Sequence, residues 1–258
     1  MDQNCEINTV HTTQLKGIYT HVAAYLRDPD PRRRKSYSPY LGSVYKLMDK
    51  EQSVTFQSEC LLPRNDRGLP RVLLLFSNPH PGSIQKGMFH SPDRRIANLW
   101  RDLRNVGLFA AEDDVLKSPD SLRKHCLNVV YECSFAFGFA CYWVFPTSYP
   151  SQLNSLFGPT MEPPGFADTK SRFDRLLAKW QPKAIISFNG KVFEHLTGKV
   201  IKGYTKRLRR QLIQGKYPAS DRGYPVFQAY PTGWRYHKNA SGLRQASLDR
   251  IAKAIHRM

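Results

Sequence analysis

The sequence predicts an α/β fold, a three-layer α/β/α arrangement around a central, mostly parallel sheet of four or five strands. Four short apolar runs support this prediction, at residues 72–76, 139–145, 184–188 and 224–230. Runs of this length and apolarity are typical of strands buried on both faces. Helical patterns separate the runs, and strands that alternate with helices indicate a parallel sheet. The chain shows no repeat or linker, so 1–258 is expected to be one domain, with 1–69 as a helical or loop extension packed on the core.

Local patterns predict the elements of the first half of the chain. Residues 12–27 can form an amphipathic helix, and the Pro- and Arg-rich loop after it holds the basic run at 32–35, which either contacts phosphates or is a solvated loop. The apolar stretch "VLLLF" at 72–76 lies between Pro70 and Pro79 and predicts a central strand. Apolar residues then recur at helical spacing from Ile96 to Val106, where Pro92 and Asp93 open a helix and Gly107 closes it.

The second half continues the alternation. "FACYWVF" at 139–145 predicts a second strand that Pro146 ends, and 146–166 is expected to be a long irregular loop because it is rich in proline. Asp168 or Thr169 caps a helix that runs to Trp180. The strand "AIISF", the Asn189-Gly190 turn and another helix follow, then the strand "YPVFQAY" and a final helix at the end of the chain.

Charge is the most informative global property. The 258 residues hold 39 Lys and Arg against 21 Asp and Glu, a formal net charge of +18. A large positive excess favours a polyanionic partner through counterion release, and nucleic acid is the usual one. The alternative is a generally soluble basic surface.

No apolar run approaches the length of a membrane span, and the N-terminus lacks the pattern of a secretory signal. The expected location is therefore the cytoplasm, without membrane contact, and the expected state is a monomer. Five cysteines show no Cys-x-x-Cys pair, which argues against a disulfide framework or a zinc site. Neither a metal nor another cofactor is expected.

In an open parallel sheet, ligands bind beyond the carboxyl ends of the strands. Three loops fall there: 77–91, 146–166 and 230–240. Residues 76–83 read "FSNPHPGS", where two prolines and a glycine force a sharp turn immediately after the first predicted strand. The turn either connects two elements or holds a reacting group.

These loops resemble the uracil-DNA glycosylase superfamily, especially its mismatch-specific and single-strand-selective branches. The matching stretches are "LLLFSNPHPGS", "GMFHSP" and "RRIANLWRDLRNVGLF", followed by "PKAIISFNGKVFEHL" and "VFQAYPTGWRYHKN". The resemblance covers roughly residues 70–257 and implies a DNA glycosylase. Such an enzyme flips a nucleotide out of the duplex and hydrolyses the bond between base and sugar.

The resemblance implies a role for each matching residue. Asn78 would orient a water against C1′ of the sugar, because an amide does not titrate and cannot act as a strong base. The alternative is that Asn78 only caps the turn. Phe89 would stack on the flipped base or be a core aromatic. The rest of the base pocket is expected to comprise Ser77, Phe145 and Asn189.

The DNA contacts are expected in two places. Main-chain N–H groups around Gly82 and Ser83 could hold a base oxygen or a phosphate. Trp234 and Arg235 would fill the gap left by the flipped base, or simply pack in a loop. The remaining expected DNA contacts are Arg94, Thr232, His237 and Lys238. The basic run 206–211 either contacts phosphates or is a solvated helix face.

Three departures from the family pattern alter the expected substrate. His80 replaces a glycine, so it would line the pocket and assist or bind the leaving base, or be a structural imidazole. "VFPTSYPS" lacks the asparagine with which many relatives read uracil, and Tyr230-Pro231-Thr232 stands where relatives carry a histidine. The cysteines also lack the spacing of the iron–sulfur relatives.

The leading hypothesis is therefore a monofunctional DNA glycosylase, a hydrolase acting on N-glycosidic bonds that leaves an abasic site. Catalytic Asn78 and His80 would act on a damaged or modified base, such as a modified pyrimidine, in DNA repair or phage defence. The alternative is a catalytically silent DNA-binding protein on the same scaffold. Phosphoester or nucleotide chemistry is the weakest hypothesis, since the chain has neither a P-loop nor clustered acids.

Overall fold

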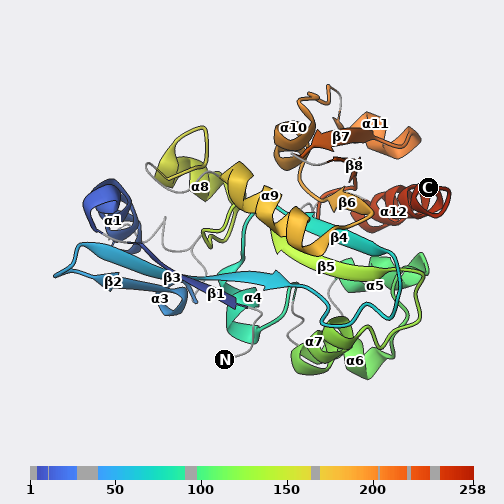
Figure 1. Ribbon diagram of the computed structural model, residues 1–258, viewed down its shortest axis with the longest axis horizontal. Helices are drawn as coiled ribbons and strands as arrows, with labels where there is room; N and C mark the ends of the chain where they lie inside the picture. The colour runs from blue at the N-terminus through green and yellow to red at the C-terminus, as the bar shows by residue number, and fades with distance from the viewer. Residues whose placement is uncertain are drawn as a thin grey trace. The chain divides into compact units, whose positions relative to one another are not determined.

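The computed structural model describes residues 5–10, 12–27, 40–90, 98–163, 169–202, 204–219, 222–232 and 239–258. The fold is α/β (Figure 1). The chain divides into two compact units. The first comprises Met1–Cys60, Ser77–Phe89 and Cys141–Arg175, and the second comprises Leu61–Phe76, His90–Ala140 and Leu176–Met258.

The first unit is built on antiparallel strands. β3 (Ser53–Leu61) pairs with β1 (Cys5–Val10) on one side and with β2 (Tyr45–Met48) on the other. Four helices belong to this unit: α1 (Thr12–Arg27), α3 (Leu41–Val44), α4 (Pro81–Lys86) and α8 (Pro150–Phe157). α1 packs against α8, and α3 packs against α4.

Aromatic side chains fill the core of the first unit. The ring of Phe145 lies 4.3 Å from that of Phe56 and meets the ring of Phe157 edge-on at 5.0 Å. All three residues are buried, and such pairs stabilise a core beyond the area they bury. The packing therefore ties the segment around Phe145 to β3 and α8.

The strands of the second unit follow the order β5-β4-β6-β8-β7. β4 (Arg71–Phe76), β6 (Ala184–Ser187) and β8 (Gly223–Gln228) are parallel, whereas β7 (Gln214–Pro218) is antiparallel to β8. β5 (Ala136–Cys141) lies beside β4 and is buried throughout. In β4 every residue from Val72 to Phe76 is also buried, as the continuous apolar pattern predicts.

Seven helices accompany these strands: α5 (Asn98–Asn105), α6 (Asp113–Lys117), α7 (Pro119–Asn128), α9 (Thr169–Trp180), α10 (Gly190–Thr197), α11 (Tyr204–Arg210) and α12 (Ala240–His256). α9 begins in the first unit. α10 packs on β6, β7 and β8, and Figure 1 shows β7 between α10 and α11. α5 packs against α12.

Most expected elements of the second unit are confirmed. The strand at 72–76, the strand at 184–188 and the final helix match β4, β6 and α12 to within a few residues. The sheet differs from the expectation, because the described residues contain eight strands and the pairing is mixed rather than mostly parallel. The antiparallel β7 was missed because "QGKYP" has no apolar run.

Three local predictions were wrong. The strand predicted at 139–145 lies at Ala136–Cys141, since the buried aromatics after Cys141 pack as side chains of a non-strand segment. The loop predicted at 146–166 contains α8, which Pro150 opens as a first-turn proline. Residues 1–69 hold three strands besides their helices, because polar residues alternate with apolar ones in β3.

Within the described ranges, no helix combines the length and apolarity needed to cross a membrane.

Candidate functional site

The turn after β4 is joined to a second loop of the first unit by main-chain hydrogen bonds. The N–H of Trp143 donates to the carbonyl of Ser77 at 2.8 Å, and the N–H of Thr147 donates to the carbonyl of Pro79 at 3.1 Å. These two hydrogen bonds therefore hold the segments 77–80 and 143–147 side by side. The prolines in both stretches prevent a regular ladder, so the side chains must supply the remaining bonds.

Asn78 supplies them. Its Nδ2 donates to the carbonyl of Thr147 at 3.0 Å, to Thr147 Oγ1 at 2.8 Å and to the carbonyl of Pro79 at 3.1 Å. Thr147 Oγ1 itself donates to the carbonyl of Tyr149, so it can only accept from Asn78. Carbonyl oxygens cannot donate, so the amide has one orientation and cannot be flipped.

The carbonyl end of Asn78 has one donor among the described residues. Ser77 Oγ donates to Asn78 Oδ1 at 3.0 Å. An amide oxygen has two lone pairs, which leaves one acceptor position. Both residues are partly exposed to solvent. A water bound at the remaining position would have a defined direction.

His80 is the N-cap of α4. Its Nδ1 accepts a hydrogen bond from the N–H of Gly82 at 3.1 Å, so a neutral ring carries its proton on Nε2. The residue is exposed. The imidazole thus has the structural role that the sequence left open as the alternative, and base binding by its far side stays a prediction.

The expected anion donors are already engaged. The N–H of Gly82 donates to the His80 ring, and the N–H of Ser83 donates to the His80 carbonyl at 2.9 Å. A phosphate or base oxygen would have to replace these bonds. A side chain at Gly82 would lie 3.2 Å from Tyr40, so the glycine allows this close packing.

Two aromatic residues expected in the base pocket are buried. Phe89 is 3% exposed and Phe145 is 1% exposed. Phe145 is in contact with Phe56 and Phe157, as described above. A base could stack on either ring only after a neighbouring side chain moves, and that role stays a prediction.

Sequence reasoning missed Glu59, a residue of β3 whose carboxyl group contacts the main chain of His80. Its Oε1 accepts a hydrogen bond from the main-chain N–H of His80 at 3.3 Å, and its Oε2 has no partner among the described residues. Burial raises the pKa of this carboxyl to about 8, and the His80 N–H opposes part of the increase. The one available signal was a lone acid within an apolar, alternating strand.

Thr147 was also missed, although it lies in the stretch "VFPTSYPS" where an asparagine was sought. It is 1% exposed and provides two of the three acceptors of Asn78. Thr147 lies 69 residues from Asn78 along the chain, so no local sequence pattern indicates this contact.

The second unit carries two of the expected residues. Asn189 is the N-cap of α10 and its side chain accepts from the N–H of Val192 at 3.2 Å. Thr232 follows Pro231, whose carbonyl accepts from Arg244 Nη1 at 2.9 Å. Arg244 in turn pairs with Asp102, and both side chains are almost fully buried. This ion pair holds the start of the loop after β8.

Five expected DNA contacts lie outside the described residues, and so does the basic run at 32–35. The five are Arg94, Trp234, Arg235, His237 and Lys238.

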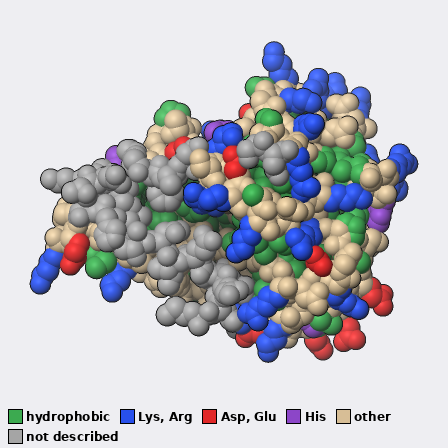
Figure 2. All heavy atoms as spheres, viewed as in Figure 1, with side chains coloured by type: hydrophobic (Ala, Val, Ile, Leu, Met, Phe, Trp, Pro, Cys, Tyr) green, Lys and Arg blue, Asp and Glu red, His purple; other side chains and the backbone are tan. Residues whose placement is uncertain are grey.

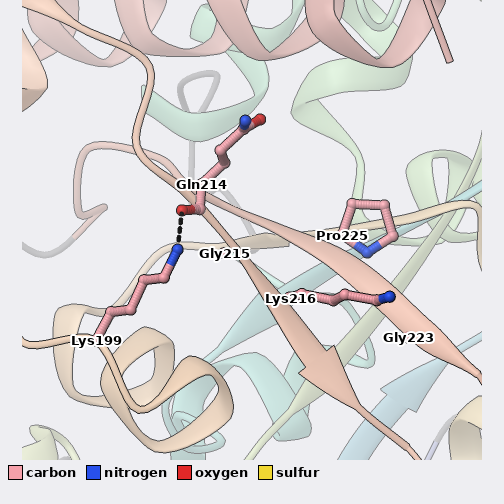
Figure 3. A pocket seen from close by; sticks show the side chains of 6 residues that line it. All are labelled: Lys199, Gln214, Gly215, Lys216, Gly223 and Pro225. Atoms are coloured by element: carbon pink, nitrogen blue, oxygen red, sulfur yellow. Dashed lines mark hydrogen bonds between the residues drawn. The ribbon is translucent and has the colours of Figure 1, made fainter.

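An open pocket of about 370 Å³ lies against the β7–β8 hairpin of the second unit (Figure 3). It is lined by Lys199, Gln214, Gly215, Lys216, Gly223 and Pro225. None of the residues predicted from the sequence lines it. Among the described residues, no group of three or more His, Cys, Asp or Glu side chains could hold a metal ion.

Neither a family model nor a curated protein of known function matches this chain.

Proposed function

We propose that this protein is a monofunctional DNA glycosylase of the uracil-DNA glycosylase type, in which Asn78 orients the hydrolytic water. The observation that carries the proposal is the single orientation of the Asn78 amide. Its Nδ2 is held by Thr147 and Pro79, and its Oδ1 keeps an acceptor position. The resemblance of the surrounding motif and the charge of +18 support the same function.

The reaction is a hydrolysis. A water held at Asn78 Oδ1 bonds through its oxygen to C1′ of the flipped nucleotide, and the C1′–N bond breaks with its electron pair leaving on the base. The proton released by the water ends on the base, so the products are the free base and an abasic sugar. Asn78 contributes orientation alone, which can account for a large share of a barrier when the attacking geometry is right.

The proposed substrate is a damaged or modified pyrimidine. Thr147 occupies the stretch where relatives carry a uracil-reading asparagine, and its hydroxyl is used by Asn78 and Tyr149. It is therefore not available to read a base edge. Within this proposal the fold is a three-layer α/β/α sandwich, and the protein is a cytoplasmic monomer that serves in repair or phage defence.

A specific observation favours the second candidate, a catalytically silent DNA-binding protein. The Asn78 amide is engaged in structural hydrogen bonds, and Phe89 and Phe145 are buried. A protein that kept this scaffold but had lost catalytic activity would keep the same hydrogen bonds and the same buried rings. The two candidates differ in whether free base is released.

The test incubates the protein with genomic DNAs and oligonucleotides that carry different bases, then detects free base by mass spectrometry and abasic sites by alkaline cleavage. Asn78→Ala is expected to lower kcat about a hundredfold with little change in KM, since misplacing a reacting group has that cost. Asn154→Ala is the matched control, because Asn154 is exposed on α8 of the same unit.

Both variants are checked for folding by thermal unfolding. DNA that is bound but never loses a base would establish the silent candidate. An Asn78→Ala variant as active as the parent would remove the mechanism and keep the enzyme class.

A further inference from the structure

One edge of the second unit carries a concentration of positive charge. Between residues 191 and 222 the described part of the chain has nine exposed cations and one carboxylate, the half-buried Glu194. We call the nine the basic edge: Lys191, Lys199, Lys202, Lys206, Arg207, Arg209, Arg210, Lys216 and Arg222. Figure 2 shows Lys and Arg side chains gathered where Figure 1 draws α10, α11 and β7.

The topology sets these cations along a line. β7 is the last strand of the sheet, and its register pairs Gln214 with Phe227 and Pro218 with Gly223. It therefore runs from the carboxyl end of β8 back to the start of β8. α11 precedes β7, and its buried Leu208 packs with Tyr230 just after β8. From α11 through Lys216 to Arg222, the cations thus run from the carboxyl end of β8 back to its start.

The pocket of Figure 3 lies within this line. Lys199 Nζ donates to the main-chain carbonyl of Gln214 at 3.4 Å, and Lys216 extends along the hairpin toward Gly223. A Cβ at Gly223 would lie 1.7 Å from Lys216 Cε, so the glycine leaves the path of this side chain open. The pocket is large enough for a phosphate group, and both lysines line it.

Ordinary surface charge does not account for the basic edge. Lysine on an edge strand protects against aggregation, but β7 itself contains only Lys216. On α6 and α7 of the same unit, by contrast, surface cations form ion pairs: Lys117 pairs with Asp113 and Asp114, and Arg123 pairs with Asp120. No cation of the basic edge forms an ion pair with a carboxylate of the described residues.

We infer that the basic edge binds the phosphate backbone of duplex DNA without reading its bases, as a contact separate from the Asn78 loop. The inference rests on the proposed function in taking DNA rather than RNA as the polyanion. A line of unpaired cations with few acids matches a regularly spaced chain of phosphates, and binding releases condensed counterions. The contact is independent of whether the DNA contains a base to be excised.

The test measures binding of the full-length protein to a fluorescent duplex of ordinary bases, by anisotropy over a range of salt concentrations. Two double variants are used: Lys199→Gln with Lys216→Gln at the pocket, and Arg207→Gln with Arg209→Gln on α11. Each lost phosphate contact is expected to reduce the slope of log K against log salt by about 0.9, so each pair by about 1.8.

The matched control removes the same charge from another surface of the same unit, by Lys117→Gln with Lys124→Gln on α6 and α7. It is expected to keep the parental slope. The inference is overturned if neither edge variant changes the slope, if the control lowers it equally, or if duplex RNA binds more tightly than duplex DNA.

Folding of each variant is verified by thermal unfolding before binding is measured. Because the duplex contains no modified base, its binding does not depend on the glycosylase proposal. If the parent releases no base but the edge variants lower the salt slope, the proposed function alone is rejected. If the parent releases base but the edge variants keep the parental slope, the basic edge alone is rejected.

Discussion

At the scale of single residues, the role proposed for Asn78 depends on which end of its side-chain amide contacts each partner. Asn78 donates through Nδ2 to Thr147 and Pro79, and its carbonyl accepts from Ser77 and keeps one acceptor position. A side chain that only capped the turn would instead accept from a nearby main-chain N–H. This difference is the physical reason to give Asn78 an orienting role.

Glu59 leads to a prediction on pH. Its folded pKa of about 8 exceeds its ordinary value, so the folded state binds the proton more tightly than the unfolded chain does. The stability that this proton supplies is complete below the ordinary pKa of a glutamate and is lost as pH rises to about 8. Glu59→Gln mimics the protonated acid, so the variant is expected to lack this loss.

The measurement compares the thermal midpoints of the parent and Glu59→Gln at several values of pH on both sides of 8. The difference is expected to grow in favour of the variant as pH rises from the ordinary pKa of a glutamate to about 8, and to level off above that pH. The Cys141 thiol lies near this carboxyl, and burial raises the pKa of Cys141 well above its ordinary value. A difference that stays constant across the range would contradict the assignment to Glu59.

At the scale of elements, a buried polar network connects α5 to α12 in the second unit. Asp102 of α5 accepts from Arg244, Ser241 and Gln245 of α12, and Arg244 also donates to the Pro231 carbonyl. Two helices and the loop after β8 thus share one buried network. Such a pair is costly to break and less costly to replace as a whole.

Arg244→Met is therefore expected to lower the free energy of unfolding by about 3–5 kcal/mol, because it leaves Asp102 charged and buried. The double variant with Asp102→Leu is expected to recover most of this loss, since no charge then remains unpaired. Urea unfolding of the parent, both single variants and the double variant measures the coupling. Additive losses in the double variant would show that the two side chains do not act as a pair.

At the scale of the whole molecule, charge is the dominant property. A net +18 raises the free energy of any compact state through self-repulsion and makes binding to a polyanion favourable. A ligand that binds the folded state alone stabilises it by mass action.

Duplex DNA is therefore expected to raise the thermal midpoint of the protein at low salt, and this increase is expected to disappear as salt is raised. Differential scanning fluorimetry over a salt series measures the effect. Double-stranded oligonucleotides of ordinary bases suffice, and an acidic protein of similar size serves as the control additive. An increase that persists at high salt would show that binding is not governed by phosphate contacts.

The extent to which the sequence predicts the fold differs between the two units. In the second, β4, β6 and α12 could be predicted because each is a continuous local pattern that prolines or glycines delimit. In the first, β2 and β3 were missed, since their mixed polar pattern becomes a buried strand only through pairing. β7 was missed for the same reason.

The sequence by itself determined that Asn78 follows a buried strand in a turn rich in proline, and that the chain is strongly basic, because both follow from local composition. The tertiary structure decided which residues form hydrogen bonds with Asn78 and with Asp102. Thr147 lies 69 residues from Asn78 along the chain, and Arg244 lies 142 residues from Asp102. Hydrogen bonds between such distant groups depend on how the chain closes on itself, and no local pattern encodes that closure.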